Sequence, residues 1–135
     1  MDEISAEIVD LNATIGAVAE LLCLVASRDL ILRTKLDPDL ARIQATHRQM
    51  EWLFVNLVAR AYDTMMPSSE LTITTSNVRV EEAPGACVQV ELIMTSGCIE
   101  TGTAARDIIR RAGGLVSANS SSGCGSRLTI LFPAA

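Results

Sequence analysis

Two stretches of period-two patterning, residues 71–80 and 87–94, constrain the fold of this chain more than any other feature. They read LTITTSNVRV and CVQVELIM. Alternation of this kind is typical of β-strands, because successive side chains of a strand point to opposite faces of a sheet. The connecting EEAPGA contains a proline and a glycine, which favour a turn. We therefore predict two adjacent strands with one face against a hydrophobic core.

Helical and strand patterns alternate through the rest of the chain. Residues 15–26 carry apolar side chains at helical spacing, and Asn12 is a favourable N-cap for this helix. A second helix is predicted from Thr46, which can form a capping box with Gln49, to about Met66. The remaining predicted elements are strands at 31–36 and 42–45, a turn at 37–40, a helix at 101–112 ended by Gly113 and Gly114, and a hairpin of 115–119 with 126–132.

This order of elements predicts the fold class. Paired antiparallel strands with helices between them favour a two-layer α/β sandwich, in which helices cover one face of a mixed, mostly antiparallel sheet. The composition, 49% hydrophobic and 20% charged, is that of a folded globular protein. At 135 residues the chain fits a single domain (1–135), without an internal repeat or a linker.

Charge and hydropathy exclude several classes of function. The net charge of −5 argues against nucleic-acid binding, which needs clustered Lys and Arg. The longest apolar stretch, residues 15–26, is interrupted by Glu20 and is shorter than the roughly 20 residues that span a bilayer. The acidic N-terminus does not look like a signal peptide. We therefore expect a cytoplasmic protein without membrane contact.

The cysteines indicate a metal site only weakly. Cys23, Cys87, Cys98 and Cys124 form no CxxC pair, and His47 is far from all of them in sequence. We expect no bound metal and, in the cytoplasm, reduced thiols. Cys98 and Cys124 both fall in Gly/Ser-rich loops, so a redox or metal role for these two stays open.

Several phrases of the sequence resemble the ATP-binding domain of bacterial sensor histidine kinases, the Bergerat or GHKL-type domain. VDLNATIGAVAELL resembles its first helix, and residues 32–67 resemble its strand, turn and N-box helix. Residues 71–97 are similar to the strand pair before the first glycine box, and residues 110–133 resemble the last helix and hairpin. The phrases occur in family order over nearly the whole chain. The resemblance therefore implies the histidine kinase ATPase-like fold.

The positions that handle ATP in this family carry unsuited residues. The N-box presents two asparagines one turn apart to Mg²⁺; Asn56 matches the first, but Arg60 stands at the second. A guanidinium has no lone pair to give a cation. Asp63 matches the acidic residue that follows in many members. Met94 stands where the family has an aspartate that accepts a hydrogen bond from the adenine amino group. A thioether accepts hydrogen bonds poorly.

The glycine boxes and the lid are also reduced. Ser96 and Cys98 stand at the two glycine positions of the first box, and only residues 98–104 precede the last helix. Gly102 alone matches the phosphate loop, and one glycine is a weak signal. We therefore expect neither ATP nor Mg²⁺ binding and no catalytic residue. The resemblance thus leaves a vestigial pocket of Asn56, Arg60, Asp63, Met94, Gly97 and Gly102.

The predicted N-box helix carries two apolar stripes. One is expected to face the core: Met50, Leu53, Phe54, Leu57 and Ala61. A helix that is apolar on both faces is either enclosed or offered to a partner. The second stripe contains the only Trp and Tyr of the chain, at positions that are usually polar in the family. Its members are Trp52, Val55, Ala59, Tyr62 and Met66.

Two interpretations of the second stripe stay open. Trp52 and Tyr62 either close the gap left by the short lid or belong to a protein-binding patch, since both residue types are enriched in interface hot spots. If the stripe is a protein-binding patch, we expect a non-catalytic module that binds a histidine kinase or a response regulator. Inhibition of the kinase is one form of this regulation. The alternative is a nucleotide or anion sensor that uses Arg60 without Mg²⁺. The sequence leaves the oligomeric state open.

Overall fold

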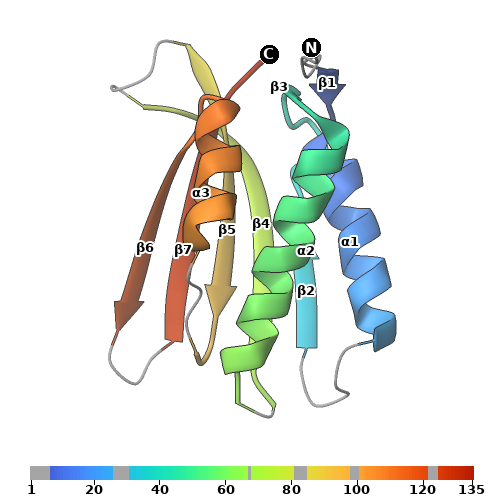
Figure 1. The fold of residues 1–135 in the computed structure, drawn as a ribbon, viewed down its shortest axis with the longest axis vertical. Coiled ribbons are helices and arrows are strands. Elements are labelled where there is room, and N and C mark those ends of the chain that lie inside the picture. The colour runs from blue at the N-terminus through green and yellow to red at the C-terminus, as the bar shows by residue number, and fades with distance from the viewer. Residues whose placement is uncertain (1–6, 26–30, 67, 81–84, 98–100, 122–124) are drawn as a thin grey trace.

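A computed structural model describes residues 7–25, 31–66, 68–80, 85–97, 101–121 and 125–135. Within these ranges the chain forms three helices and seven strands (Figure 1). In chain order they are β1 (Glu7–Val9), α1 (Leu11–Val25), β2 (Ile31–Lys35), β3 (Ile43–Ala45), α2 (His47–Thr64), β4 (Glu70–Arg79), β5 (Ala86–Met94), α3 (Gly102–Arg111), β6 (Leu115–Ser121) and β7 (Gly125–Pro133).

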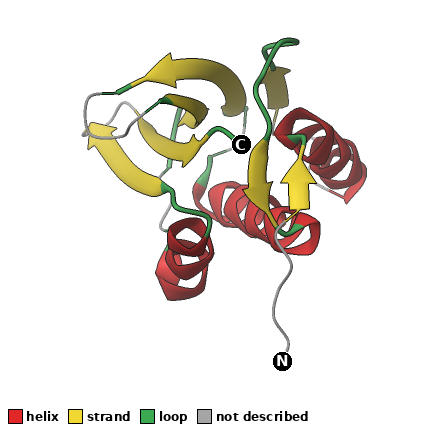
Figure 2. Cartoon of the chain, turned by 90° about the horizontal axis from the view of Figure 1, so that it is seen from above, coloured by secondary structure: helices red, strands yellow, loops and turns green. Residues whose placement is uncertain are grey.

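The architecture is the predicted two-layer α/β sandwich. Five strands form one sheet in the order β2-β4-β5-β7-β6, and the helices lie on one of its faces (Figure 2). β2 and β4 run parallel, whereas the other neighbours in this sheet are antiparallel. The short strands β1 and β3 pair with each other in a separate two-stranded sheet.

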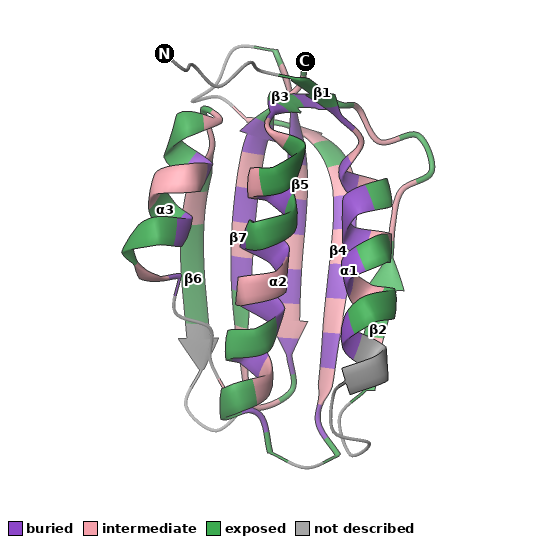
Figure 3. Ribbon diagram, turned by 45° about the vertical axis from the view of Figure 1, so that its right-hand side comes forward, coloured by how far each residue is buried: buried purple, intermediate pink, exposed green. Residues whose placement is uncertain are grey.

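The core lies between α2 and the middle strands of the sheet. Buried and less buried residues alternate from Glu70 to Thr75 in β4, from Val88 to Met94 in β5 and from Leu128 to Pro133 in β7, which is the pattern of a sheet with one covered face (Figure 3). The predicted core stripe of α2 is confirmed, and Val58 is buried with it. The inward residues of the strands are Leu71, Ile73, Val88, Val90, Leu92, Met94, Leu128, Ile130 and Phe132.

The predicted N-cap at Asn12 is wrong, because α1 begins at Leu11, two residues before the start that an N-cap at Asn12 implies. Asp10 caps the helix: its Oδ1 accepts hydrogen bonds from the backbone nitrogens of Asn12 (3.1 Å) and Ala13 (3.4 Å). Asn12 lies inside the first turn and connects two other segments. Its Nδ2 donates to the carbonyl of Asp37 (2.6 Å), and its Oδ1 accepts from the buried hydroxyl of Thr75 (2.9 Å).

The start of α2 also differs from the expectation. Thr46 occupies the N-cap position as predicted, but its side chain makes no capping bond. A carboxylate from β1 takes this role, because Oε1 of Glu7 accepts a hydrogen bond from the backbone nitrogen of His47 (3.0 Å). β1 itself was not predicted, since three residues are too few to show a period.

The ends of the helices agree with the sequence where the structure describes them. After α3, the nitrogen of Gly113 donates to Arg110 (2.9 Å) and that of Gly114 to Ile109 (2.9 Å). This Schellman arrangement, with Gly113 at a φ of 79°, confirms the predicted C-cap. α2 ends at Thr64, two residues before the predicted end. The predicted end of the first helix, near Arg28 and Asp29, lies outside the described residues.

The hydrogen bonds of Thr75 predict a specific loss of stability. Its hydroxyl accepts from the nitrogen of Asp37 (2.9 Å) and donates to Asn12, so Thr75→Val leaves buried polar groups without this partner. We expect the free energy of unfolding in urea to fall by about 1–3 kcal/mol. Thr74→Val, on the opposite face of the same strand, is the control and should change it by less than about 0.5 kcal/mol. Equal losses would contradict the role of the buried bonds.

Candidate functional site

The positions aligned with the kinase ATP site lie around the second half of α2, the loop after β5 and the start of α3. Arg60 reaches the N-terminus of α3: an ideal Cβ on Gly102 would lie 3.2 Å from its Nη2. Gly97 lies against the end of α2, where an ideal Cβ would be 2.7 Å from Oγ1 of Thr64. The structure therefore brings Arg60 to Gly102 and Gly97 to α2.

Met94 belongs to the hydrophobic core. It is the last residue of β5, is buried, and points to the same face of the sheet as Val90 and Leu92. A thioether in this apolar environment contributes packing and offers little to a polar ligand.

Asn56 and Asp63 both lie on α2, in different surroundings. Nδ2 of Asn56 donates to the carbonyl of Trp52 (2.7 Å), one turn earlier on the same helix. Asp63 is exposed on the surface of α2. Among the residues that the structure describes, no group of three or more His, Cys, Asp or Glu side chains could hold a metal ion.

The loop after β5, where the resemblance places the first glycine box, joins the end of β5 to the end of α2. Oγ of Ser96 accepts a hydrogen bond from the backbone nitrogen of Met66 (3.0 Å) and shares another with the hydroxyl of Ser69. Ser96 stands at one of the two glycine positions of that box, so a side chain added there makes these contacts. In this chain the loop is a structural connection between α2 and the sheet.

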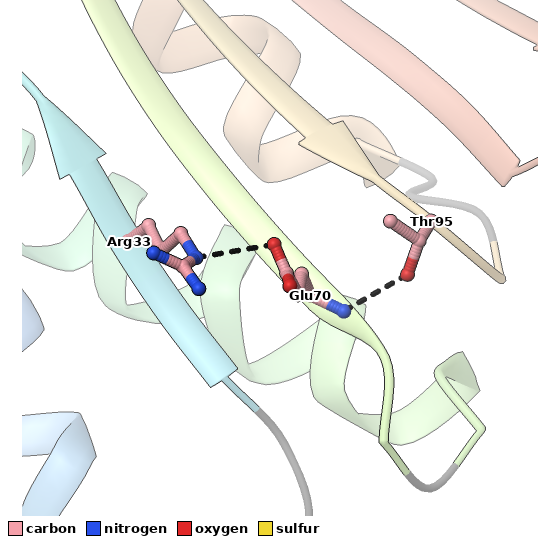
Figure 4. Close-up of polar contacts among 3 residues, drawn as sticks. All are labelled: Arg33, Glu70 and Thr95. Carbon is pink, nitrogen blue, oxygen red and sulfur yellow. Dashed lines mark hydrogen bonds and ion pairs between the residues drawn. The ribbon is translucent and has the colours of Figure 1, made fainter.

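Thr95 extends this connection to β4 (Figure 4). The nitrogen of Glu70 donates to Oγ1 of Thr95 (2.9 Å), and the nitrogen of Thr95 donates to the carbonyl of Glu70 (3.0 Å). The Glu70 carboxylate accepts from Nε of Arg33 on β2 (3.1 Å). The roles of Thr95, Ser96 and Ser69 were not predicted from the sequence. The sequence signal for these roles is the position of short hydroxyl side chains next to the ends of helices and strands, where such side chains form hydrogen bonds with backbone groups.

The second apolar stripe of α2 divides into two parts. Val55 and Tyr62 are partly buried and pack against the core. Trp52 and Met66 are 42% and 65% exposed, and Ala59 between them is also exposed. Tyr62 therefore fits the interpretation in which the stripe fills space near the core. The exposed members of the stripe are Trp52 and Ala59 on α2 and Met66 two residues past its end, and we call these three residues the α2 outer surface.

The predicted redox or metal role of two cysteines concerns residues that the structure does not describe. Cys98 and Cys124 lie outside the described residues, as does the side chain of Cys23. Cys87 is a free, buried thiol in β5, where a cysteine behaves as a small apolar residue. No helix in the described ranges combines the length and apolar character needed to cross a membrane.

The fold is that of the catalytic, ATP-binding domains of histidine kinases. The catalytic domain of histidine kinase ThkA superposes with a TM-score of 0.80 at 17% identity, over 97% of this chain and 99% of that one. The mycobacterial sensor histidine kinase MprB gives 0.78 at 13% identity, over 96% and 97%. Full-length ShkA, in a complex with AMPPNP, gives 0.73 at 19% identity, over 99% and 32%. Neither protein-family models nor curated protein sequences give a significant match.

The contact between Gly97 and α2 predicts that this glycine tolerates a side chain poorly. Gly97 has a φ of 82°, and a Cβ would meet the backbone oxygen of Thr64 at 2.8 Å. We expect Gly97→Ala to lower the free energy of unfolding by about 2–4 kcal/mol, measured by urea denaturation.

Gly85→Ala is the matched control. Gly85 has a φ of 80°, but no atom lies within 4 Å of its ideal Cβ. Only the backbone conformation opposes this substitution, so a loss of about 1 kcal/mol is expected. If the two variants lost the same stability, the close packing of the loop on α2 would not matter to the fold.

Proposed function

We propose that this protein is a non-catalytic, histidine kinase-like module that regulates two-component signalling by binding a protein partner. The observation that carries this proposal is the α2 outer surface. Trp52 and Ala59 are exposed on α2, the helix that resembles the N-box helix of the kinases, and Met66 is exposed two residues past its end. Exposed apolar surface around a tryptophan is typical of interface hot spots.

The contacts of the vestigial pocket support the non-catalytic part of the proposal. Met94 is in the core, and the amide of Asn56 bonds to its own helix. Ser96 bonds to the end of α2. Met94 and Ser96 are used for packing and for internal hydrogen bonds, whereas in the kinases the position of Met94 carries an aspartate that reads adenine. Arg60 in place of an N-box asparagine adds a cation where a cation would bind.

The fold supports the choice of partner class. Kinases of this fold carry their phosphorylated histidine on a separate helical hairpin, which their own ATP-binding domain must approach. A module of the same shape without ATP chemistry can occupy that hairpin, or a receiver domain that docks on it. We therefore propose a histidine kinase or a response regulator as the partner, with inhibition of the kinase as the direct consequence.

A second candidate function is the binding of a nucleotide or another anion without Mg²⁺. The observation in its favour is the position of Arg60, whose guanidinium lies beside Gly102, the first residue of α3. A guanidinium next to the N-terminus of a helix provides favourable electrostatics for a phosphate or a carboxylate.

The α2 outer surface can be tested with a pair of variants that have the same exposure. Trp52 is 42% exposed on the helical face, and Ile31 is 41% exposed on β2. Binding to purified histidine kinases and receiver domains of the source organism would be measured by biolayer interferometry. We expect Trp52→Ser to raise the Kd of the bound partner roughly tenfold or more, and Ile31→Ser to leave it unchanged. The proposal fails if no kinase or receiver binds the wild-type protein.

Titration calorimetry separates the two candidate functions. With ATP, ADP or inorganic phosphate at millimolar concentration, in the presence and absence of Mg²⁺, we expect no binding heat from the wild-type protein. Heat that disappears in Arg60→Gln would instead support the anion sensor. Heat that requires Mg²⁺ would contradict both the sensor and the non-catalytic module, because it would indicate a working nucleotide site.

A further inference from the structure

β6 forms an open edge of the five-stranded sheet. In the described part of the chain it is the last strand of the sheet and pairs only with β7. Leu115 is 59% exposed, and Ser117, Ala118 and Asn119 are exposed as well. The backbone groups on the far side of an edge strand are a template for a further strand.

The sequence of β6 lacks the features that usually protect an edge. LVSANSS contains no proline and no charged residue. Natural edge strands are commonly protected by lysine, proline or a bulge. The opposite edge, β2, carries Arg33 and Lys35, both of which are exposed. The two edges therefore differ in charge, and only β6 offers a neutral strand.

We propose that β6 pairs antiparallel with β6 of a second copy of this chain. In a symmetric pair, each strand meets its own sequence, so a charged strand would face like charges. β2 would bring Lys35 and Arg33, which is paired with Glu70, toward the same residues of the second copy, whereas β6 brings only neutral side chains together. With Ser117 on the two-fold axis, Leu115 lies opposite Asn119 of the second copy. Charge compatibility thus selects a second copy as the occupant and β6 as the contact.

The geometry of antiparallel pairing defines the shape of this dimer. Its two-fold axis is perpendicular to the sheet, so the two five-stranded sheets continue into one another and all helices lie on the same side. Both copies of the α2 outer surface then face one direction. A two-fold symmetric partner could bind them together, with a gain from avidity. The dimer itself does not depend on the proposed function, because β6 and α2 are separate surfaces.

Sedimentation equilibrium over a range of protein concentrations tests the dimer. We expect the wild-type protein to approach twice the monomer mass, and Ser117→Lys to weaken the association roughly tenfold or more, since the introduced lysines face each other across the two-fold axis. Thr34→Lys is the matched control: it places the same residue at an exposed position of β2 and should leave the association unchanged. Circular dichroism would establish that both variants fold.

Hydrogen exchange provides a second measurement that needs no variant. Amides of β6 should become more protected as the protein concentration rises, while those of β2 should not change. A wild-type protein that stays monomeric at every concentration would overturn the proposal. It would also be overturned by a dimer that persists in Ser117→Lys but dissociates in Trp52→Ser, because α2 would then be the contact. Neither result would bear on the binding of a kinase or receiver by the monomer.

Discussion

The packing of one apolar stripe of α2 against β4, β5 and β7 is the interaction on which the rest of the structure depends. Six side chains of this helix are buried, and burial of a large apolar side chain stabilises a fold by about 1.5–3 kcal/mol. This packing determines the rotation of α2 about its axis. Trp52 must then point to solvent, Arg60 toward α3, and Thr64 toward the loop after β5.

With that rotation set, residues at positions that resemble the ATP site of the kinases contribute to packing and to hydrogen bonds within the protein. The end of β5 contributes Met94 to the core, and the following loop bonds to the end of α2 through Ser96. These substitutions are mutually consistent, because each one adds contacts between α2 and the sheet. The helix keeps its place in the fold, and its exposed face becomes the surface on which the proposed function rests.

Sequence patterns predicted those features that are local or periodic. The core stripe of α2, the alternation of β4 and β5 and the C-cap at Gly113 all follow from a repeat or from the conformation of a single residue. The cap of α1 by Asp10 and the carboxylate of Glu7 at the start of α2 could not be predicted in this way. Asp10 is one of several neighbouring residues that are suited to cap α1. Glu7 lies 40 positions before its partner His47 in the chain.

The sequence by itself determined the fold class and which residue types stand at the positions that resemble the ATP site of the kinases, because hydrophobic periods and residue chemistry are properties of the chain. Only the tertiary structure decided what the remaining residues do. Trp52 and Tyr62 belong to the same stripe, yet Tyr62 packs against the core and Trp52 is exposed. Spacing along a helix gives the direction of a side chain, but its burial depends on the elements that pack beside it.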